Sequence, residues 1–121
     1  MTNQDVTALF DQWNNALSTG DPKKVTSLYA SNATLLPTIS NQIRHSHQEI
    51  EDYFVQFLET KPHGKLVEQN IKIFDELIIN SGIYIFSFKD DSCVTARFSY
   101  VYQLLQDEWK IITHHSSRMP E

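Results

Sequence analysis

The sequence has only one cysteine, Cys93, so an intramolecular disulfide is excluded. The 121 residues must instead be held together by a hydrophobic core, which a chain of this length can build without disulfides or metals. A lone cysteine is also typical of proteins in a reducing compartment. We therefore expect a cytoplasmic protein.

Basic residues and long apolar runs are scarce as well. Ten Lys and Arg stand against 15 Asp and Glu, and the net charge of -5 gives no electrostatic basis for binding nucleic acid or an anionic membrane. No apolar run is long enough to span a bilayer, and residues 1–5 lack the basic region of a secretory signal. We expect neither a nucleic-acid partner nor a membrane partner.

Glycine and proline are also few, with three Gly and four Pro, while 40% of the residues are hydrophobic. These values are ordinary for a globular chain. The sequence contains no linker, internal repeat or low-complexity tract. We expect one domain over residues 1–121.

The most informative stretch is the last quarter, where residues 93–102 and 109–117 flank a turn at 106–107. Each flank alternates in twos and is rich in β-branched and aromatic residues, which is typical of half-buried strands. A two-residue hairpin turn makes the predicted pairs Leu104 with Trp109, Tyr102 with Ile111, Tyr100 with Thr113 and Phe98 with His115. The aromatic face of the hairpin therefore ends in polar groups, as a small-molecule pocket requires.

Three segments upstream have apolar residues at helical spacing. The first helix is expected over 5–19, with Asp5, or Thr2 together with Asp5, as its N-cap. The second begins at Asp21-Pro22 and is expected to end at Ser31-Asn32, followed by a short strand over 33–36. The third begins at Ser46, which has a glutamate three residues on, and is broken at 62–64.

The remaining chain alternates as strands over 67–73 and 77–88, and residues 80–82 of the second suggest a bulge or bend. Helices and strands are thus segregated along the chain. We predict an α+β fold in which a strongly curved, cone-shaped, mostly antiparallel sheet carries three helices on its concave face.

Two segments carry a resemblance to a known superfamily. ALSTGDPKKVTSLYASNATLL (residues 16–36) resembles the helix, Gly-Asp, helix, short-strand opening of the nuclear transport factor 2-like superfamily, which has a cystatin-like fold. ARFSYVYQLLQDEWKIITHHSSRMPE (residues 96–121) is similar to the closing hairpin of one branch. That branch comprises the calcium/calmodulin-dependent protein kinase II association domain and its stand-alone bacterial relatives of the SnoaL-like and SgcJ/EcaC type.

The resemblance implies homo-oligomeric assembly around a deep pocket. In the kinase this domain is a hub that assembles rings, and its pocket carries arginines. Tyr100 and Ser116 stand where those arginines are expected, and His115 matches a histidine near the pocket, so the anionic ligands of the kinase domain are not implied here. No Gly-rich loop, His-Arg-Asp or Asp-Phe-Gly segment is present, and we expect no kinase activity.

His114 and His115 are the candidate catalytic residues. Successive side chains of a strand alternate between its faces, so only one imidazole faces the pocket unless a bulge intervenes. The hairpin pairing favours His115 with Thr113 and Ser117, whereas a register shifted by one residue favours His114 with Ser116. The pocket imidazole would be a general acid or base near neutral pH. Alternatively, one histidine hydrogen-bonds in the core and the other lies at a subunit interface.

Other side chains are expected to contact a ligand, although the aromatic residues among them also suit a core. Buried tyrosine hydroxyls need partners, so several that converge either bond one another or leave a polar cavity. We expect no metal site and no cofactor, because no further ligands pair with the strand histidines. The candidate ligand-binding residues are Trp13, Tyr29, Arg44, Tyr53, Phe98, Tyr100, Ser116 and Ser117.

We predict a homo-oligomeric small-molecule-binding or assembly domain, a homodimer or a higher homo-oligomer, that contacts itself through the outer sheet face of Arg97, Ser99, Val101 and Gln103. The alternative is a small SnoaL-like or ketosteroid-isomerase-like lyase or isomerase that uses a pocket histidine as acid or base. The acidic residues lie in turns and at helix starts, which counts against the carboxylate chemistry of a steroid isomerase. A purely structural hub would have a pocket filled by side chains.

Overall fold

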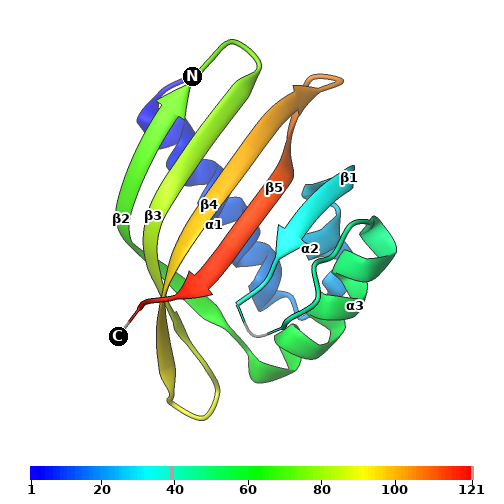
Figure 1. Ribbon diagram of the computed structural model, residues 1–121, viewed down its shortest axis with the longest axis vertical. Helices are drawn as coiled ribbons and strands as arrows, with labels where there is room; N and C mark the ends of the chain where they lie inside the picture. Colours follow the sequence, from blue (N-terminus) through cyan, green and yellow to red (C-terminus); the bar gives the residue numbers. More distant parts are fainter. Residues whose placement is uncertain (39, 121) are drawn as a thin grey trace.

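A curved five-stranded sheet forms the framework, and one long helix crosses its inner face (Figure 1). The computed structural model describes residues 1–38 and 40–120. Its helical elements are α1 (Asn3–Ser18), α2 (Pro22–Thr26), α3 (His47–Phe57) and the 3-10 turn η1 (Leu58–Thr60). Its strands are β1 (Tyr29–Leu36), β2 (His63–Ile73), β3 (Leu77–Ser87), β4 (Cys93–Leu105) and β5 (Glu108–Arg118).

The strands lie in the order β1-β5-β4-β3-β2. The last four form an antiparallel meander, and β1 adds to it in parallel beside β5. In Figure 1, α1 runs behind the sheet while α2 and α3 lie beside β1. The predicted α+β class, with a curved and mostly antiparallel sheet and three helices, is confirmed.

Helix α1 begins where its predicted cap lies. The Thr2 hydroxyl accepts a hydrogen bond from the Asp5 N–H at 3.2 Å, and the Asp5 carboxylate accepts one from the Thr2 N–H at 2.8 Å. This reciprocal box satisfies two amide groups that the helix itself leaves unpaired. The apolar stripe of α1 then faces the sheet and is buried there; it comprises Val6, Phe10, Trp13 and Leu17.

The second helix is shorter than predicted. It ends at Thr26 rather than at Ser31-Asn32, and β1 already begins at Tyr29. The reason is long-range, because the Leu28 carbonyl accepts a hydrogen bond from the Ile111 N–H of β5 at 3.0 Å. Residues 29–32 therefore belong to strand β1, which pairs with β5. The local spacing of apolar residues cannot predict this, because the pairing partner lies far away in the sequence.

The predicted bulge at residues 80–82 is also corrected. Strand β3 pairs with β4 without interruption from Leu77 to Ser87. The register shift lies instead across from it in β2, between Leu66 and Glu68. Gly82 accommodates this bulge, because a Cβ atom there would lie 2.0 Å from the Glu68 carbonyl oxygen.

A second register shift lies in the closing hairpin. The turn at Gln106 and Asp107 has φ angles of 51° and 66°, as a two-residue hairpin turn requires, and Tyr102 pairs with Ile111 as predicted. The next pair is Val101 with Thr113, so Ile112 is one extra residue in β5. Every pair beyond it moves by one position. The predicted pairs Tyr100 with Thr113 and Phe98 with His115 are therefore wrong, and the observed pairs are Tyr100 with His114 and Phe98 with Ser116.

Among the described residues, no helix combines the length and the apolarity that crossing a membrane requires.

Candidate functional site

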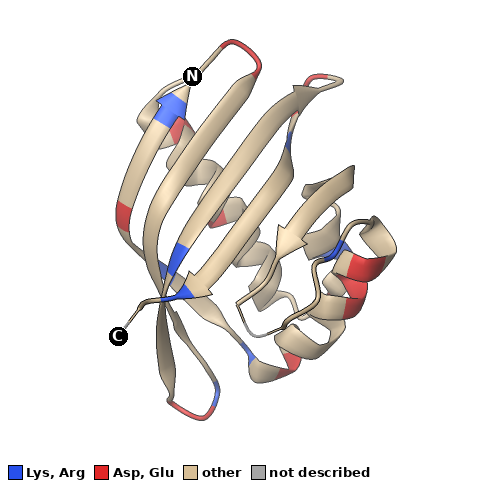
Figure 2. Cartoon of the chain, viewed as in Figure 1, with Lys and Arg blue, Asp and Glu red and all other residues tan. Residues whose placement is uncertain are grey.

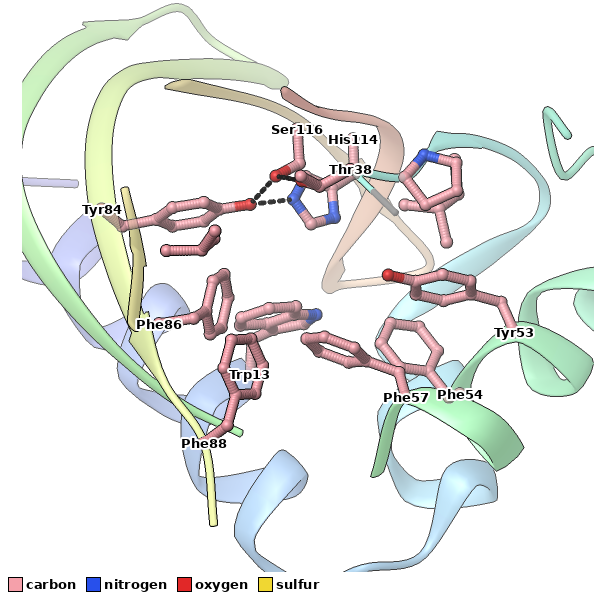
Figure 3. A pocket seen from close by; sticks show the side chains of 13 residues that line it. Trp13, Thr38, Tyr53, Phe54, Phe57, Tyr84, Phe86, Phe88, His114 and Ser116 are labelled. Carbon is pink, nitrogen blue, oxygen red and sulfur yellow. Dashed lines mark hydrogen bonds between the residues drawn. The ribbon is translucent and has the colours of Figure 1, made fainter. Parts of the chain in front are cut away.

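An apolar pocket lies between α1, α3 and the inner face of the sheet (Figure 3). It encloses about 410 Å³ when its open mouth is included, of which about 30 Å³ can take the centre of a water molecule. That smaller volume is room for about two waters. Side chains therefore fill most of the pocket in this conformation, which is the arrangement expected of a purely structural hub. The lining residues are Trp13, Leu35, Pro37, Thr38, Tyr53, Phe54, Phe57, Tyr84, Phe86, Phe88, Val94, His114 and Ser116.

The sheet supplies the polar end of this pocket. Because of the extra residue Ile112, the next inward positions of β5 are His114 and Ser116, and both are buried. Tyr84 projects inward from the middle of β3, and Thr38 follows Pro37 just after β1. Figure 3 shows the Tyr84 hydroxyl pointing at His114 and Ser116.

These side chains form one continuous chain of hydrogen bonds. The Trp13 Nε1–H donates to the Tyr29 hydroxyl at 3.1 Å, and that hydroxyl lies 2.9 Å from His114 Nδ1. On the other side of the ring, His114 Nε2 lies 3.3 Å from the Tyr84 hydroxyl, which donates to Ser116 Oγ at 2.6 Å. Ser116 in turn shares a short hydrogen bond with the Thr38 hydroxyl, the last group of the chain.

The direction of donation along this chain follows from its first member. An indole N–H can only donate, so the Tyr29 oxygen accepts and its own proton is available for His114 Nδ1. Nδ1 is then the acceptor nitrogen, and the proton of the neutral ring sits on Nε2, which donates to the Tyr84 oxygen. One neutral tautomer of His114 therefore satisfies every bond from Trp13 to Ser116.

Burial keeps His114 neutral. Desolvation, with a smaller contribution from nearby His115, lowers the pKa of the His114 imidazole from 6.5 to about 3. The ring stacks on Tyr100 with centroids 4.1 Å apart and meets the Trp13 ring edge-on at 5.5 Å. Packing and hydrogen bonds thus fix both its position and its protonation state.

The structure brings together only some of the predicted site residues. Trp13, Tyr53, His114 and Ser116 line the pocket. Behind this wall, Tyr29 hydrogen-bonds to His114 and Tyr100 stacks on it.

The other predicted residues lie elsewhere. His115, the favoured candidate, is exposed on the opposite face of the sheet. Ser117 lies on that outer face too, because the register shift turns both side chains away from the pocket. Phe98 is buried but stacks on Tyr84 outside the lining residues, at a centroid distance of 4.7 Å. The Arg44 guanidinium lies over the Tyr53 ring, 5.6 Å from its centroid, and is not among the residues that line the pocket.

Sequence reasoning missed Tyr84, which joins His114 to Ser116. Its signal is present, because the buried positions Ile78, Asn80, Tyr84 and Phe86 alternate along β3. Assigning the inner face of that strand would have found it. Thr38 has no comparable signal, since it follows a proline in an irregular segment. The other lining residues missed are Leu35, Pro37, Phe54, Phe57, Phe86, Phe88 and Val94.

The chemistry available in the pocket is that of neutral hydrogen-bonding groups. An imidazole with a pKa of about 3 is a weak base at neutral pH, and none of the described lining residues is Asp, Glu, Lys or Arg. Within residues 1–38 and 40–120, no group of three or more His, Cys, Asp and Glu side chains could hold a metal ion. The site is therefore suited to binding more than to acid–base catalysis.

Comparison with known proteins shows the family and the fold. The family model described as calcium/calmodulin dependent protein kinase II association domain matches residues 2–120. The chain belongs to this family. A solved structure from Xanthomonas campestris that bears the same association-domain name is 44% identical, with a TM-score of 0.96 over 100% of this chain and 90% of that one. The search of curated proteins gave no match.

More distant structures share the fold of this association-domain family. A nuclear transport factor 2-like protein of unknown function from Pseudomonas putida is 15% identical, with a TM-score of 0.85 over 98% of this chain and 87% of that one. A protein with a cystatin-like fold from Nostoc punctiforme is also 15% identical, with a TM-score of 0.82 over 100% and 96%. Family and fold together support an assembly or ligand-binding domain.

Proposed function

We propose that this association-domain family member is a homo-oligomeric domain that binds a small, largely apolar molecule in the pocket beneath its sheet and has no kinase activity. The observation that carries the proposal is the pocket itself. Aromatic and aliphatic walls enclose it, and its polar groups converge at one end in a chain of hydrogen bonds. An apolar cavity with a few oriented polar groups is the usual form of a small-molecule site.

Ligand entry requires side chains to move, because the open space holds only about two waters. The lining residues that solvent reaches are half-buried and include Phe88 and Val94. Exposed rotamers interconvert on the picosecond to nanosecond scale, so rotation of such side chains is a fast route to a wider pocket.

The self-association part of the proposal is supported by the outer face of the sheet. Ile79, Ile83 and Val101 lie half-buried there; Ile83 pairs with Arg97, and His115 pairs with Ser99 in the row between Val101 and Arg97. Apolar groups flanked by polar ones are typical of an interface core with its rim. Figure 2 shows few charged segments along β3, β4 and β5.

The acid–base alternative has less support. It needs a group whose pKa lies near the working pH, and burial places the pKa of His114 at about 3. His115 is exposed on the face away from the pocket. The role left for His114 at neutral pH is to orient the Tyr84 hydroxyl, which in turn donates to Ser116.

A thermal-shift titration with 2-phenylpropene tests pocket binding. At a free concentration ten times Kd, a ligand that binds only the folded state adds about 1.4 kcal/mol of stability, so the melting temperature rises. Val94→Phe fills the mouth and should abolish this rise. Val101→Phe makes the same change on the outer face and should preserve it. A rise of equal size in the Val94→Phe protein, or no rise in the unmodified protein, contradicts the proposal.

A further inference from the structure

We infer that the pocket selects uncharged, flat molecules carrying a hydrogen-bond acceptor oxygen, of the aryl ketone or aldehyde class, and that the Thr38–Ser116 hydroxyl pair binds this oxygen. The inference rests on the proposed binding function and adds the chemical class of the ligand. Three observations carry it: the direction of the hydrogen-bond chain, the lack of charge among the described lining residues, and the aromatic walls.

Counting protons shows what the pair offers to a ligand. The Tyr84 hydroxyl donates its only proton to Ser116 Oγ. Ser116 and Thr38 then have two hydroxyl protons between them and one shared hydrogen bond. Whichever of the two donates in that bond, one proton is left over. Both residues line the pocket, so its polar end presents a donor, and the complementary ligand group is an acceptor.

The absence of formal charge excludes a carboxylate as the preferred acceptor. None of the described lining residues is Lys or Arg, and His114 is neutral. Arg44 is not among the lining residues, and its Nη2 donates to Ser40 Oγ at 3.2 Å and its Nη1 to the Glu49 carbonyl at 3.5 Å. Its guanidinium lies over the Tyr53 ring, 5.6 Å from the centroid, and its buried Nε has no partner among the described residues. An anion held by the Thr38–Ser116 pair would therefore lose its water without a counter-charge among the lining side chains, which is strongly unfavourable in an apolar site.

The walls favour a flat ring. The rings of Phe57 and Phe86 meet edge-on with centroids 5.7 Å apart, and Trp13 meets Phe86 in the same way at 6.0 Å. Figure 3 shows the Tyr53 hydroxyl directed from α3 into the pocket, with no bond to the other residues drawn. A small aromatic ring packs well against such walls, while its carbonyl oxygen reaches the hydroxyl pair and the Tyr53 hydroxyl offers a second contact.

Three probes of nearly the same shape separate the possibilities: acetophenone, its hydrocarbon analogue 2-phenylpropene, and benzoate. Their Kd values are measured by fluorescence of Trp13 in a Trp109→Phe background, which leaves one tryptophan. Benzoate should bind at least about a hundredfold more weakly than acetophenone, because its buried charge has no partner. Binding of benzoate as tightly as acetophenone overturns the inference.

A double variant, Thr38→Val with Ser116→Ala, removes both hydroxyls without adding an atom to the pocket. The ratio of the acetophenone Kd to the 2-phenylpropene Kd should rise about three- to tenfold, the value of one neutral hydrogen bond. Ser117→Ala on the outer face is the matched control and should leave the ratio unchanged. An unchanged ratio in the double variant overturns the role of the hydroxyl pair.

Infrared spectroscopy of bound acetophenone gives a second reading that does not depend on the variant folding. In the unmodified protein, the carbonyl stretch should move to lower frequency than in an apolar solvent, because a hydrogen bond weakens the C=O bond. A frequency equal to that in hydrocarbon overturns the inference. Failure of the proposed function looks different, since then 2-phenylpropene does not bind either.

Discussion

At the scale of single residues, His114 is an imidazole held almost entirely out of water. It is 3% exposed, stacked on Tyr100 and hydrogen-bonded at both ring nitrogens. A second proton would force Nδ1 to donate to Tyr29, whose oxygen already accepts from Trp13. The Tyr29 proton would then lose its acceptor. Burial and hydrogen bonding therefore both oppose the charged form.

This environment predicts a pH dependence of stability. The unfolded imidazole takes up a proton as the pH falls through 6.5, whereas the folded one does so only near 3. Between these values the unfolded state binds one more proton, so the free energy of unfolding should fall by about 1.4 kcal/mol per pH unit. In urea titrations between pH 7 and pH 5, His114→Gln should flatten this slope, and His115→Gln should leave it. Equal slopes in all three proteins contradict the prediction.

Two other buried tyrosines have hydroxyls without a hydrogen-bond partner among the described residues. They are Tyr100 and Tyr102, whose rings stack with centroids 5.7 Å apart. Burying an unpaired hydroxyl costs about 1–3 kcal/mol. Tyr100→Phe and Tyr102→Phe should therefore leave the free energy of unfolding unchanged or raise it by about 1 kcal/mol.

Tyr84→Phe is the matched contrast, since it removes the same atom from a bonded hydroxyl. It leaves the buried Ser116 Oγ without its donor and His114 Nε2 without its acceptor. We expect a loss of about 1–3 kcal/mol in urea unfolding. If all three variants lose similar stability, the difference between bonded and unbonded hydroxyls is contradicted.

At the scale of elements, a one-residue bulge in β5 decides which histidine faces the pocket. The bulge at Ile112 turns His114 and Ser116 inward and His115 outward. Without it, the regular hairpin would place His115 on the aromatic face. The identity of the pocket histidine therefore depends on an irregularity of the ladder and not on the alternation of the sequence.

Sequence patterns were sufficient where the interaction is local. The capping pair Thr2 and Asp5 is three residues apart, the hairpin turn lies at residues 106–107, and both are observed as predicted. Sequence patterns gave wrong predictions where the structure depends on contacts between distant segments of the chain. Ile112 resembles any other strand residue, so its extra position in the ladder has no local signal, and the parallel pairing of β1 with β5 joins segments about eighty residues apart.

The bulge in β2 gives a test at this scale. Gly82 faces it, and a Cβ there would lie 2.0 Å from the Glu68 carbonyl oxygen and 2.7 Å from its carbon. Backbone atoms cannot turn aside as a flexible side chain can, so Gly82→Ala should destabilise the protein by about 1–3 kcal/mol or more. The neighbouring change Ser81→Ala should stay within about 0.5 kcal/mol. Thermal and urea unfolding of both variants would show the contrast, and an undisturbed Gly82→Ala protein would contradict the close approach.

At the scale of the whole molecule, the two faces of the sheet differ in what they contact. The inner face packs on the helices and encloses the pocket, while the outer face leaves Ile79, Ile83 and Val101 half-buried. The chain carries a net charge of -5, and Figure 2 shows its charged segments mostly at turns, helices and strand ends. A second copy could therefore approach the outer face without crossing a dense layer of charge.

This arrangement predicts an isologous dimer through the outer face, in which each copy offers the same patch. Sedimentation at micromolar concentration should show a species larger than the monomer. A stable interface covers about 800 Å² on each partner, and Val101 pairs with Ile79 near the middle of the face. Val101→Glu would bury an unpaired charge there and should give monomers. Val55→Glu makes the same change on α3, where the side chain is 48% exposed, and should leave assembly intact. A monomeric unmodified protein would contradict self-association altogether. An assembly that tolerates Val101→Glu would mean that the copies meet through a surface other than the outer face of the sheet.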